Sequence, residues 1–140
     1  MKISKESENL SSDIPAMLDI INTEFQQPNN YSSFIYPFSK EHCRGHFQNY
    51  PLVPGIFIYD RLVKNQLGWL KEIKGISKGN VFLDSLQIDI LLPSFPNTVH
   101  IVRTWVREIS HSYYRFTHEV YGENEPEKLS FLLVTCVEVL

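Results

Sequence analysis

The sequence has few cysteines, no large excess of charge of either sign, and no long apolar run. Cys43 and Cys136 are its two cysteines and lie far apart, so reduced thiols are expected and a CxxC metal cluster is excluded. A net charge of −3 gives no basic surface for nucleic acid. No apolar run approaches the roughly 18 residues that a membrane-spanning helix needs.

The N-terminus is polar and lacks the apolar core of a secretory signal. We therefore predict a cytoplasmic protein in which residues 1–12 form a flexible tail. A chain of 140 residues is long enough for one well-filled core but not for two. We expect a single domain over 1–140.

The main helical pattern begins at Pro54-Gly55 and continues to about Ile73. Apolar residues recur there at spacings of three and four, and proline is tolerated in a first helical turn. Gly75 is a candidate C-terminal cap. The first two turns are apolar nearly all round, which predicts deep burial. Polar side chains in the second half are expected to face water: Lys64, Asn65, Gln66, Lys71, Glu72 and Lys74.

The remaining segments predict strands. Alternation within 80–93 puts Phe82, Leu86, Ile88 and Ile90 on one apolar face, with Asp84 as the exception. Two short strands before the helix and four after it predict an α+β fold, with a mostly antiparallel sheet wrapped around one long central helix. The six predicted strands cover 17–25, 31–39, 80–93, 98–110, 113–122 and 129–140.

Three groups near the start of the predicted helix point to chemistry at a carbonyl. His46 can accept a proton at neutral pH. Gly55 leaves a helix N-terminal N–H open to a ligand oxygen. Asp60 follows Ile-Phe-Ile-Tyr, and apolar surroundings would favour its protonated, proton-donating form. The alternatives are an ordinary loop histidine, a glycine that only starts the helix, and an aspartate paired with Arg61 or Lys64.

The segment GHFQNYPLVPGIFIYD resembles the signature of the β-hydroxyacyl-acyl-carrier-protein dehydratases, a hotdog-fold family. The acid falls 14 residues after the histidine, as in that family. The resemblance implies a hotdog fold and a lyase that removes water from 3-hydroxyacyl thioesters in fatty-acid or polyene/polyketide-type biosynthesis. It also implies an acyl-carrier-protein partner, a homodimer, and no metal or redox cofactor. The matching positions are Gly45, His46, Phe47, Pro51, Pro54, Gly55 and Asp60.

The resemblance also implies roles for individual residues. His46 would remove the C2 proton, Asp60 would protonate the departing hydroxyl, and the Gly55 N–H would bind the thioester oxygen. The acyl chain would lie in a tunnel between the two central helices of a dimer. Its contacts would include Phe47, Pro54, Phe57 and Leu62.

The sequence departs from this signature at Lys64, where the family usually carries glutamine. A lysine one helical turn after Asp60 favours an ionised carboxylate, which is unsuited to an acid role. Lys64 keeps one alternative open, a weakly active hotdog subunit that binds acyl chains or an active partner in a hetero-oligomer. A hotdog acyl-thioesterase is the other alternative. Metal binding is not expected, because His42 and His46 lack a third ligand at a useful spacing.

Overall fold

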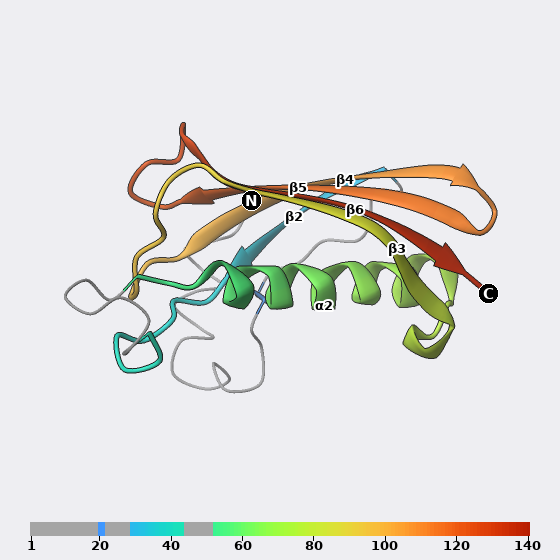
Figure 1. The fold of residues 1–140 in the computed structure, drawn as a ribbon, viewed down its shortest axis with the longest axis horizontal. Helices are drawn as coiled ribbons and strands as arrows, with labels where there is room; N and C mark the ends of the chain where they lie inside the picture. Colours follow the sequence, from blue (N-terminus) through green and yellow to red (C-terminus); the bar gives the residue numbers. More distant parts are fainter. Residues whose placement is uncertain (1–19, 22–28, 44–51) are drawn as a thin grey trace.

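The computed structural model describes residues 20–21, 29–43 and 52–140. Within these residues, a six-stranded antiparallel sheet curves over one long helix, α2 (Figure 1). Neighbouring strands follow the order β1-β2-β4-β5-β6-β3. The tail predicted over 1–12 lies outside the described residues. The elements are β1 (Ile20–Ile21), β2 (Asn30–Ile35), α2 (Gly55–Lys74), a 3-10 turn η1 (Lys78–Asn80), β3 (Val81–Ile90), β4 (His100–Ser110), β5 (Tyr113–Gly122) and β6 (Leu129–Val139).

The helix begins and ends where its sequence pattern predicts. Pro54 caps its start in an extended conformation, and Gly75 ends it in the left-handed region at φ 68°. The Gly75 N–H donates to the Lys71 carbonyl at 3.0 Å, and the Ile76 N–H donates to the Leu70 carbonyl at 3.1 Å. These two bonds satisfy carbonyls that the helix end would leave open. Among the described residues, no helix combines the length and apolar character needed to cross a membrane.

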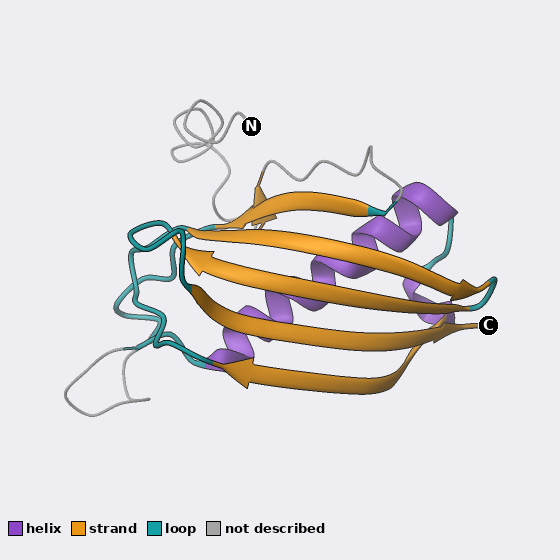
Figure 2. Ribbon diagram, turned by 90° about the horizontal axis from the view of Figure 1, so that it is seen from above, coloured by secondary structure: helices purple, strands orange, loops and turns teal. Residues whose placement is uncertain are grey.

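The predicted α+β architecture is confirmed. Figure 2 shows the strands side by side with α2 crossing diagonally behind them. The alternation predicted within 98–110 and 113–122 is also correct, because alternate side chains of β4 and β5 are buried toward the helix. β2 stops at Ile35, before Pro37, whose missing N–H cannot join a ladder. Of the strand predicted over 17–25, the described part is β1, which pairs with β2.

Two apolar clusters lie between α2 and the sheet. We name them for the end of α2 that they contact. The N-terminal core contains Ile35, Phe38, Cys43, Val53, Ile58, Leu62, Val102, Val120, Phe131 and Leu133. The C-terminal core contains Tyr31, Trp69, Leu70, Val106, Tyr114, Phe116 and Val137.

Burial along α2 differs from the prediction in its first two turns and in its middle. The first two turns are not buried all round, since Ile56 is 61% exposed. Asn65 and Gln66, expected to face water, are instead buried against the sheet. The reason is geometric: one stripe of α2 meets the sheet, and Asn65 and Gln66 share that stripe with Leu62 and Trp69.

The face predicted for β3 is wrong at its start. A bulge between Leu83 and Ser85 makes Asp84 an extra residue in the ladder with β6. Leu83 therefore lies opposite buried Val137 and shares the helix-facing side with Leu86. The bulge explains the acid that interrupted the predicted apolar face, because Asp84 accepts a hydrogen bond from the Tyr113 hydroxyl.

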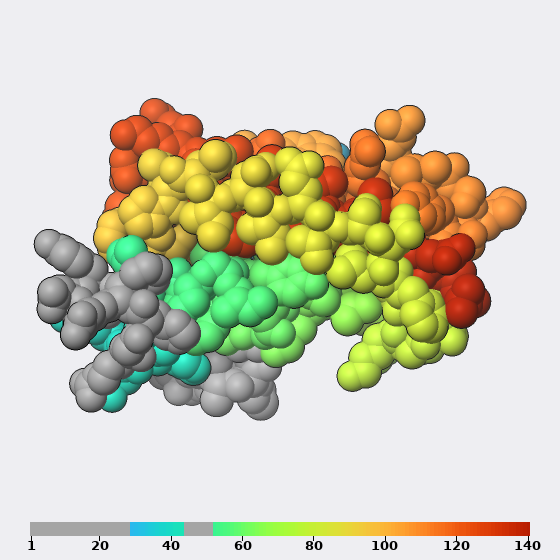
Figure 3. Space-filling model, in the orientation of Figure 1, coloured from blue at the N-terminus to red at the C-terminus, as the bar shows by residue number. Residues whose placement is uncertain are grey.

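In the described chain, β3 is an edge strand whose apolar side chains remain exposed. Figure 3 shows β3, in yellow, running directly above an exposed flank of α2, in green. Monomeric proteins seldom leave such a row of large apolar side chains on an open edge. This face therefore has the character of an interface. Its helix-facing members are Leu83, Leu86, Ile88 and Ile90.

Candidate functional site

A cavity of about 310 Å³ opens beside the first turn of α2. Ile58 of α2 and Phe131 of β6 lie on its inner side and are almost fully buried. The end of β3 and the loop after it form its outer side. An apolar cavity of this size suits a hydrocarbon group. In the described residues its lining consists of Leu52, Val53, Gly55, Ile58, Ile90, Leu91, Leu92, Pro93, Ser94 and Phe131.

Backbone hydrogen bonds hold the two sides of the cavity in place. The Val53 N–H donates to the Ser94 carbonyl at 2.8 Å, which ties the segment before α2 to the loop after β3. The N–H groups of Leu91 and Leu92 donate to the Ser130 carbonyl at 2.9 and 3.1 Å. The cavity is therefore formed by fixed backbone and needs little rearrangement to bind a ligand.

Gly55 is the first residue of α2 and lines the cavity. A Cβ at this position would lie 2.8 Å from Ile90 Cδ1 and 3.6 Å from Phe131 Cε2. Glycine therefore allows β3 to approach the helix start closely. The first N–H groups of a helix lack intrahelical partners and carry partial positive charge. A ligand oxygen in the cavity would meet that charge.

Asp60 is two residues from both Ile58 and Leu62, which are buried, so it lies on roughly the opposite side of α2; it is not part of the cavity lining. Its side chain is 50% exposed. Asp60 Oδ2 lies 2.9 Å from Arg61 NH1 and 3.1 Å from Lys64 Nζ. The expected apolar enclosure of this carboxylate is thus not found among the residues that the structure describes. The alternative weighed from the sequence, pairing with Arg61 or Lys64, is what the structure contains.

The other residues singled out from the sequence lie in different places. His46 and Phe47 fall outside the described residues. Pro54 caps α2 beside the cavity, and Leu62 is fully buried in the N-terminal core. Phe57 points to another side of the helix, where its ring lies 5.6 Å from that of Phe38. Of these residues, the described chain therefore brings only Gly55 to the cavity lining, with Pro54 next to it in sequence, and not Asp60, Phe57 or Leu62.

Sequence reasoning missed several residues that form the cavity. The sequence pattern indicates Ile58 only as part of an apolar helix, and Ile90 and Phe131 only as strand residues. The alternation of β3 and β6 indicated which face each side chain occupies. It did not indicate that β3 ends opposite Gly55, because strand pairing and helix position are set by contacts distant in sequence.

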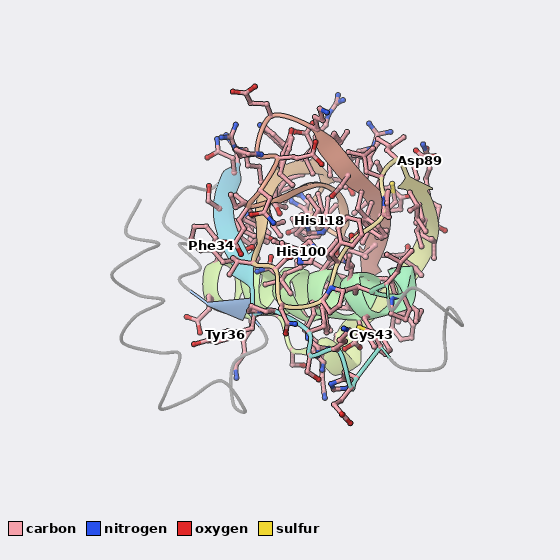
Figure 4. The ribbon with its side chains drawn as sticks, turned by 90° about the vertical axis from the view of Figure 1, so that its left-hand side faces the viewer. Phe34, Tyr36, Cys43, Asp89, His100 and His118 are labelled. Carbon is pink, nitrogen blue, oxygen red and sulfur yellow. The ribbon has the colours of Figure 1, made fainter. Side chains whose placement is uncertain are left out.

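A buried polar layer separates the two cores. Figure 4 shows His118 between the sheet and α2. Its Nε2–H donates to Gln66 Oε1 at 2.8 Å, and its Nδ1 accepts from the Thr104 hydroxyl at 2.8 Å. The Thr135 hydroxyl donates to the same Gln66 oxygen at 2.9 Å. Burial lowers the pKa of His118 to about 3, so the ring is neutral. We call Gln66, Thr104, His118 and Thr135 the polar layer.

His100 is a second buried histidine, at the end of the sheet nearest the cavity (Figure 4). It lines a smaller cavity of about 40 Å³ that shares Leu92, Pro93 and Ser94 with the larger one. Its Nδ1 has no hydrogen-bond partner among the described residues. Burial lowers the pKa of His100 to about 4. The smaller cavity is large enough for a water molecule that would satisfy this nitrogen.

Metal ligands do not cluster in the parts of the chain that the structure describes. Over residues 20–21, 29–43 and 52–140, no group of three or more His, Cys, Asp or Glu side chains could hold an ion. His42 instead lies edge-on to Phe57, with ring centroids 5.5 Å apart. The described residues therefore offer the apolar cavity and the N-terminus of α2 for ligand binding.

No protein-family model matches the sequence, and no curated protein matches it. Solved structures do match the fold. The PaaI protein of the E. coli phenylacetic acid degradation operon matches with a TM-score of 0.65 and 13% identity, covering 94% of this chain and 86% of that one. Thioesterase HI1161 of Haemophilus influenzae matches with a TM-score of 0.64 and 11% identity, covering 96% and 87%. A mutant of thioesterase PA1618 of Pseudomonas aeruginosa matches with a TM-score of 0.66 and 9% identity, covering 98% and 92%.

At these identities the likeness shows the fold, and the predicted hotdog fold is confirmed. The narrower expectation, a dehydratase of the lyase class, is contradicted, because these comparisons point to thioesterases, which are hydrolases. Asp60 is half exposed and paired with Arg61 and Lys64, so among the described residues it lacks the apolar surroundings that the dehydratase interpretation predicts. The chain has the hotdog fold.

Proposed function

We propose that this protein hydrolyses acyl thioesters. The observation that carries the proposal is the apolar cavity of about 310 Å³ beside the N-terminus of α2. It offers a hydrocarbon site directly next to backbone N–H groups that lack intrahelical partners. The thioesterases among the proteins of similar fold support the same reaction class.

In the proposed reaction, the acyl chain occupies the cavity and the thioester carbonyl lies at Gly55. The Gly55 N–H donates to the carbonyl oxygen as negative charge develops on it. A water oxygen forms a bond to the carbonyl carbon, and the carbon–sulfur bond breaks with its electron pair leaving on sulfur. The proton lost by water passes through Asp60 to the thiolate, so the products are a carboxylic acid and a thiol.

Asp60 suits the role of a base better than that of an acid. Half of its side chain is exposed, so a water molecule can reach the carboxylate. Hydrolysis needs such a group to orient water or to accept its proton. The apolar enclosure expected for a proton donor is not found among the described residues.

Asp60 lies on a face of α2 that points away from the cavity of its own chain, so the proposal includes a homodimer. The exposed apolar row on β3 lies next to the exposed flank of α2 (Figure 3). Pairing of β3 with the same strand of a second copy would cover both. In that dimer the cavity of one subunit would face Asp60 of the other. The thiol carrier is proposed to be acyl-carrier protein or coenzyme A.

The test is release of free thiol from a panel of acyl thioesters by the full chain. We expect steady-state thiol release without the enoyl absorbance that dehydration would produce. Asp60→Asn should lower kcat/KM by ~100-fold, since a positioned base is commonly worth that much. Glu72→Gln, a charge change on an exposed part of the same helix, is the control and should retain activity.

Absence of hydrolysis with every thioester would overturn the proposal. If the protein nevertheless bound acyl chains, it would be the non-hydrolytic hotdog subunit considered from the sequence. That second candidate is favoured by one observation, the engagement of Asp60 in two ion pairs. Hydration of enoyl thioesters at a higher rate than hydrolysis would also contradict the proposal.

A further inference from the structure

Ile90 occupies an unusual position at the end of β3. It lines the cavity, yet its side chain is 63% exposed. Its Cδ1 lies 2.8 Å from the position that a Cβ on Gly55 would take, and its Cγ1 lies 3.7 Å from it. The side chain therefore packs across the start of α2, between the Gly55 backbone and solvent.

This position determines which part of a substrate Ile90 would contact. If the thioester oxygen accepts a hydrogen bond from the Gly55 N–H, the carbonyl carbon, which is bonded to that oxygen, lies close to the same backbone. The next atoms of the acyl group, its α and β carbons, must then pass beside Ile90 to enter the cavity. The inner side of the cavity is formed by Ile58 and Phe131, which are fixed in the core.

We infer that Ile90 excludes acyl groups that are branched at the α or β carbon. The inference rests on the proposed function. It assigns the substrate class as acyl thioesters that are unbranched near the carbonyl. Branching far from the carbonyl is not restricted by Ile90, because the distal chain lies beyond it. Ile90 acts on specificity and takes no part in bond breaking.

Ile88 provides a matched control. It is also an isoleucine, lies two residues earlier on the same edge strand, and faces the same side of the sheet. It is partly exposed but does not belong to the described lining of the cavity. Ile88→Ala and Ile90→Ala therefore remove the same atoms from the same exposed edge. Only the second change widens the path beside Gly55.

The experiment compares three coenzyme A thioesters with equal carbon numbers: octanoyl, 2-methylheptanoyl and 6-methylheptanoyl. We expect wild type to prefer octanoyl over 2-methylheptanoyl. Ile90→Ala should raise the kcat/KM ratio of 2-methylheptanoyl to octanoyl by about tenfold, because one methyl group in a pocket changes discrimination by roughly that factor or more. Ile88→Ala should leave the ratio unchanged, and the 6-methylheptanoyl ratio should not change in either variant.

Equal ratios in Ile90→Ala and wild type, with hydrolysis intact, would overturn the inference and leave the proposed function standing. A shift in both alanine variants would assign the effect to the β3 edge in general, which also overturns it. Calorimetric binding of the free acids, octanoic and 2-methylheptanoic, provides a readout without turnover. Preference for octanoic acid that Ile90→Ala abolishes would support the inference even if hydrolysis failed. Equal binding of the two acids by wild type, or no binding of either, would overturn it.

Discussion

The two cores between α2 and the sheet differ in composition and in what surrounds them. The C-terminal core is aromatic: Trp69 meets Phe116 and Tyr114 edge-on, with ring centroids 5.6 and 6.0 Å apart. The N-terminal core is largely aliphatic where it meets α2, and it shares Ile58 and Phe131 with the cavity. Both cores are buried by the same helix and the same sheet.

This difference assigns separate tasks to the two ends of one helix. Edge-on aromatic pairs add stabilisation beyond the area that they bury. The C-terminal core is therefore the part that mainly stabilises the fold. Unfilled space beside the N-terminal core loses contacts and costs stability. Such space persists where a ligand will fill it, which agrees with the proposed acyl site.

Replacing one phenylalanine in each core should give the largest expected difference in the free energy of unfolding. Phe116 and Phe131 are both almost fully buried, but only Phe131 borders the cavity. Phe116→Ala should lower the free energy of unfolding by about 3–5 kcal/mol, and Phe131→Ala by less, because Phe131 already lacks neighbours on one side. Denaturant unfolding measures both. Equal losses would show that the cores contribute alike.

The polar layer between the cores predicts an intermediate effect that depends on pH. Burial lowers the pKa of His118 from 6.5 to about 3 in the folded chain. The unfolded state therefore binds more protons as pH falls below 6.5, and stability present above that pH is lost on acidification. The loss attributable to His118 should reach about 2 kcal/mol at pH 5, since each pH unit below 6.5 lowers the free energy of unfolding by about 1.4 kcal/mol.

Urea unfolding between pH 7 and 5 tests this prediction through its slope. His118→Gln should flatten the dependence of stability on pH, even if the variant is less stable throughout. His111, an exposed histidine in the turn between β4 and β5, is the control position. His111→Gln should keep the wild-type slope. An unchanged slope in His118→Gln would mean that His118 does not govern the acid sensitivity of the core.

The smallest expected effect on stability concerns the contact between Ile90 and Gly55 at the start of α2. Gly55→Ala should lower the free energy of unfolding by at most ~1 kcal/mol, because its Cβ would meet Ile90 Cδ1 at 2.8 Å and that atom is the end of an exposed side chain. Ile90→Val removes that atom and should relieve the cost of Gly55→Ala. A double-mutant cycle in urea measures this coupling. Additive effects of the two changes would show that the contact between β3 and α2 is not tight.

The helix and the strands could be predicted because their signals are local. Spacings of three and four, a Pro-Gly start and Gly75 define α2 within one residue or two of its observed ends. Alternation identified the buried faces of β4 and β5. These patterns depend on residues that are neighbours in the chain, so no knowledge of the packing was needed.

The candidate site could not be predicted to the same extent. The bulge at Asp84, the burial of Gln66 and the approach of Ile90 to Gly55 all depend on which distant segments meet. The motif drew attention to Gly55, which lines the cavity. It did not decide the reaction, because the same helix start and carboxylate can be used with water or with a hydroxyl group.

The polar layer ties together four positions on four separate elements: α2, β4, β5 and β6. A hydrophobic replacement of any one member would leave the hydrogen-bonding atoms of the others buried and unsatisfied, at a cost of about 1–3 kcal/mol for each group. In proteins descended from a common ancestor with this one, these four positions should accordingly change as a set, with polar quartets exchanged for apolar quartets and few mixtures between them.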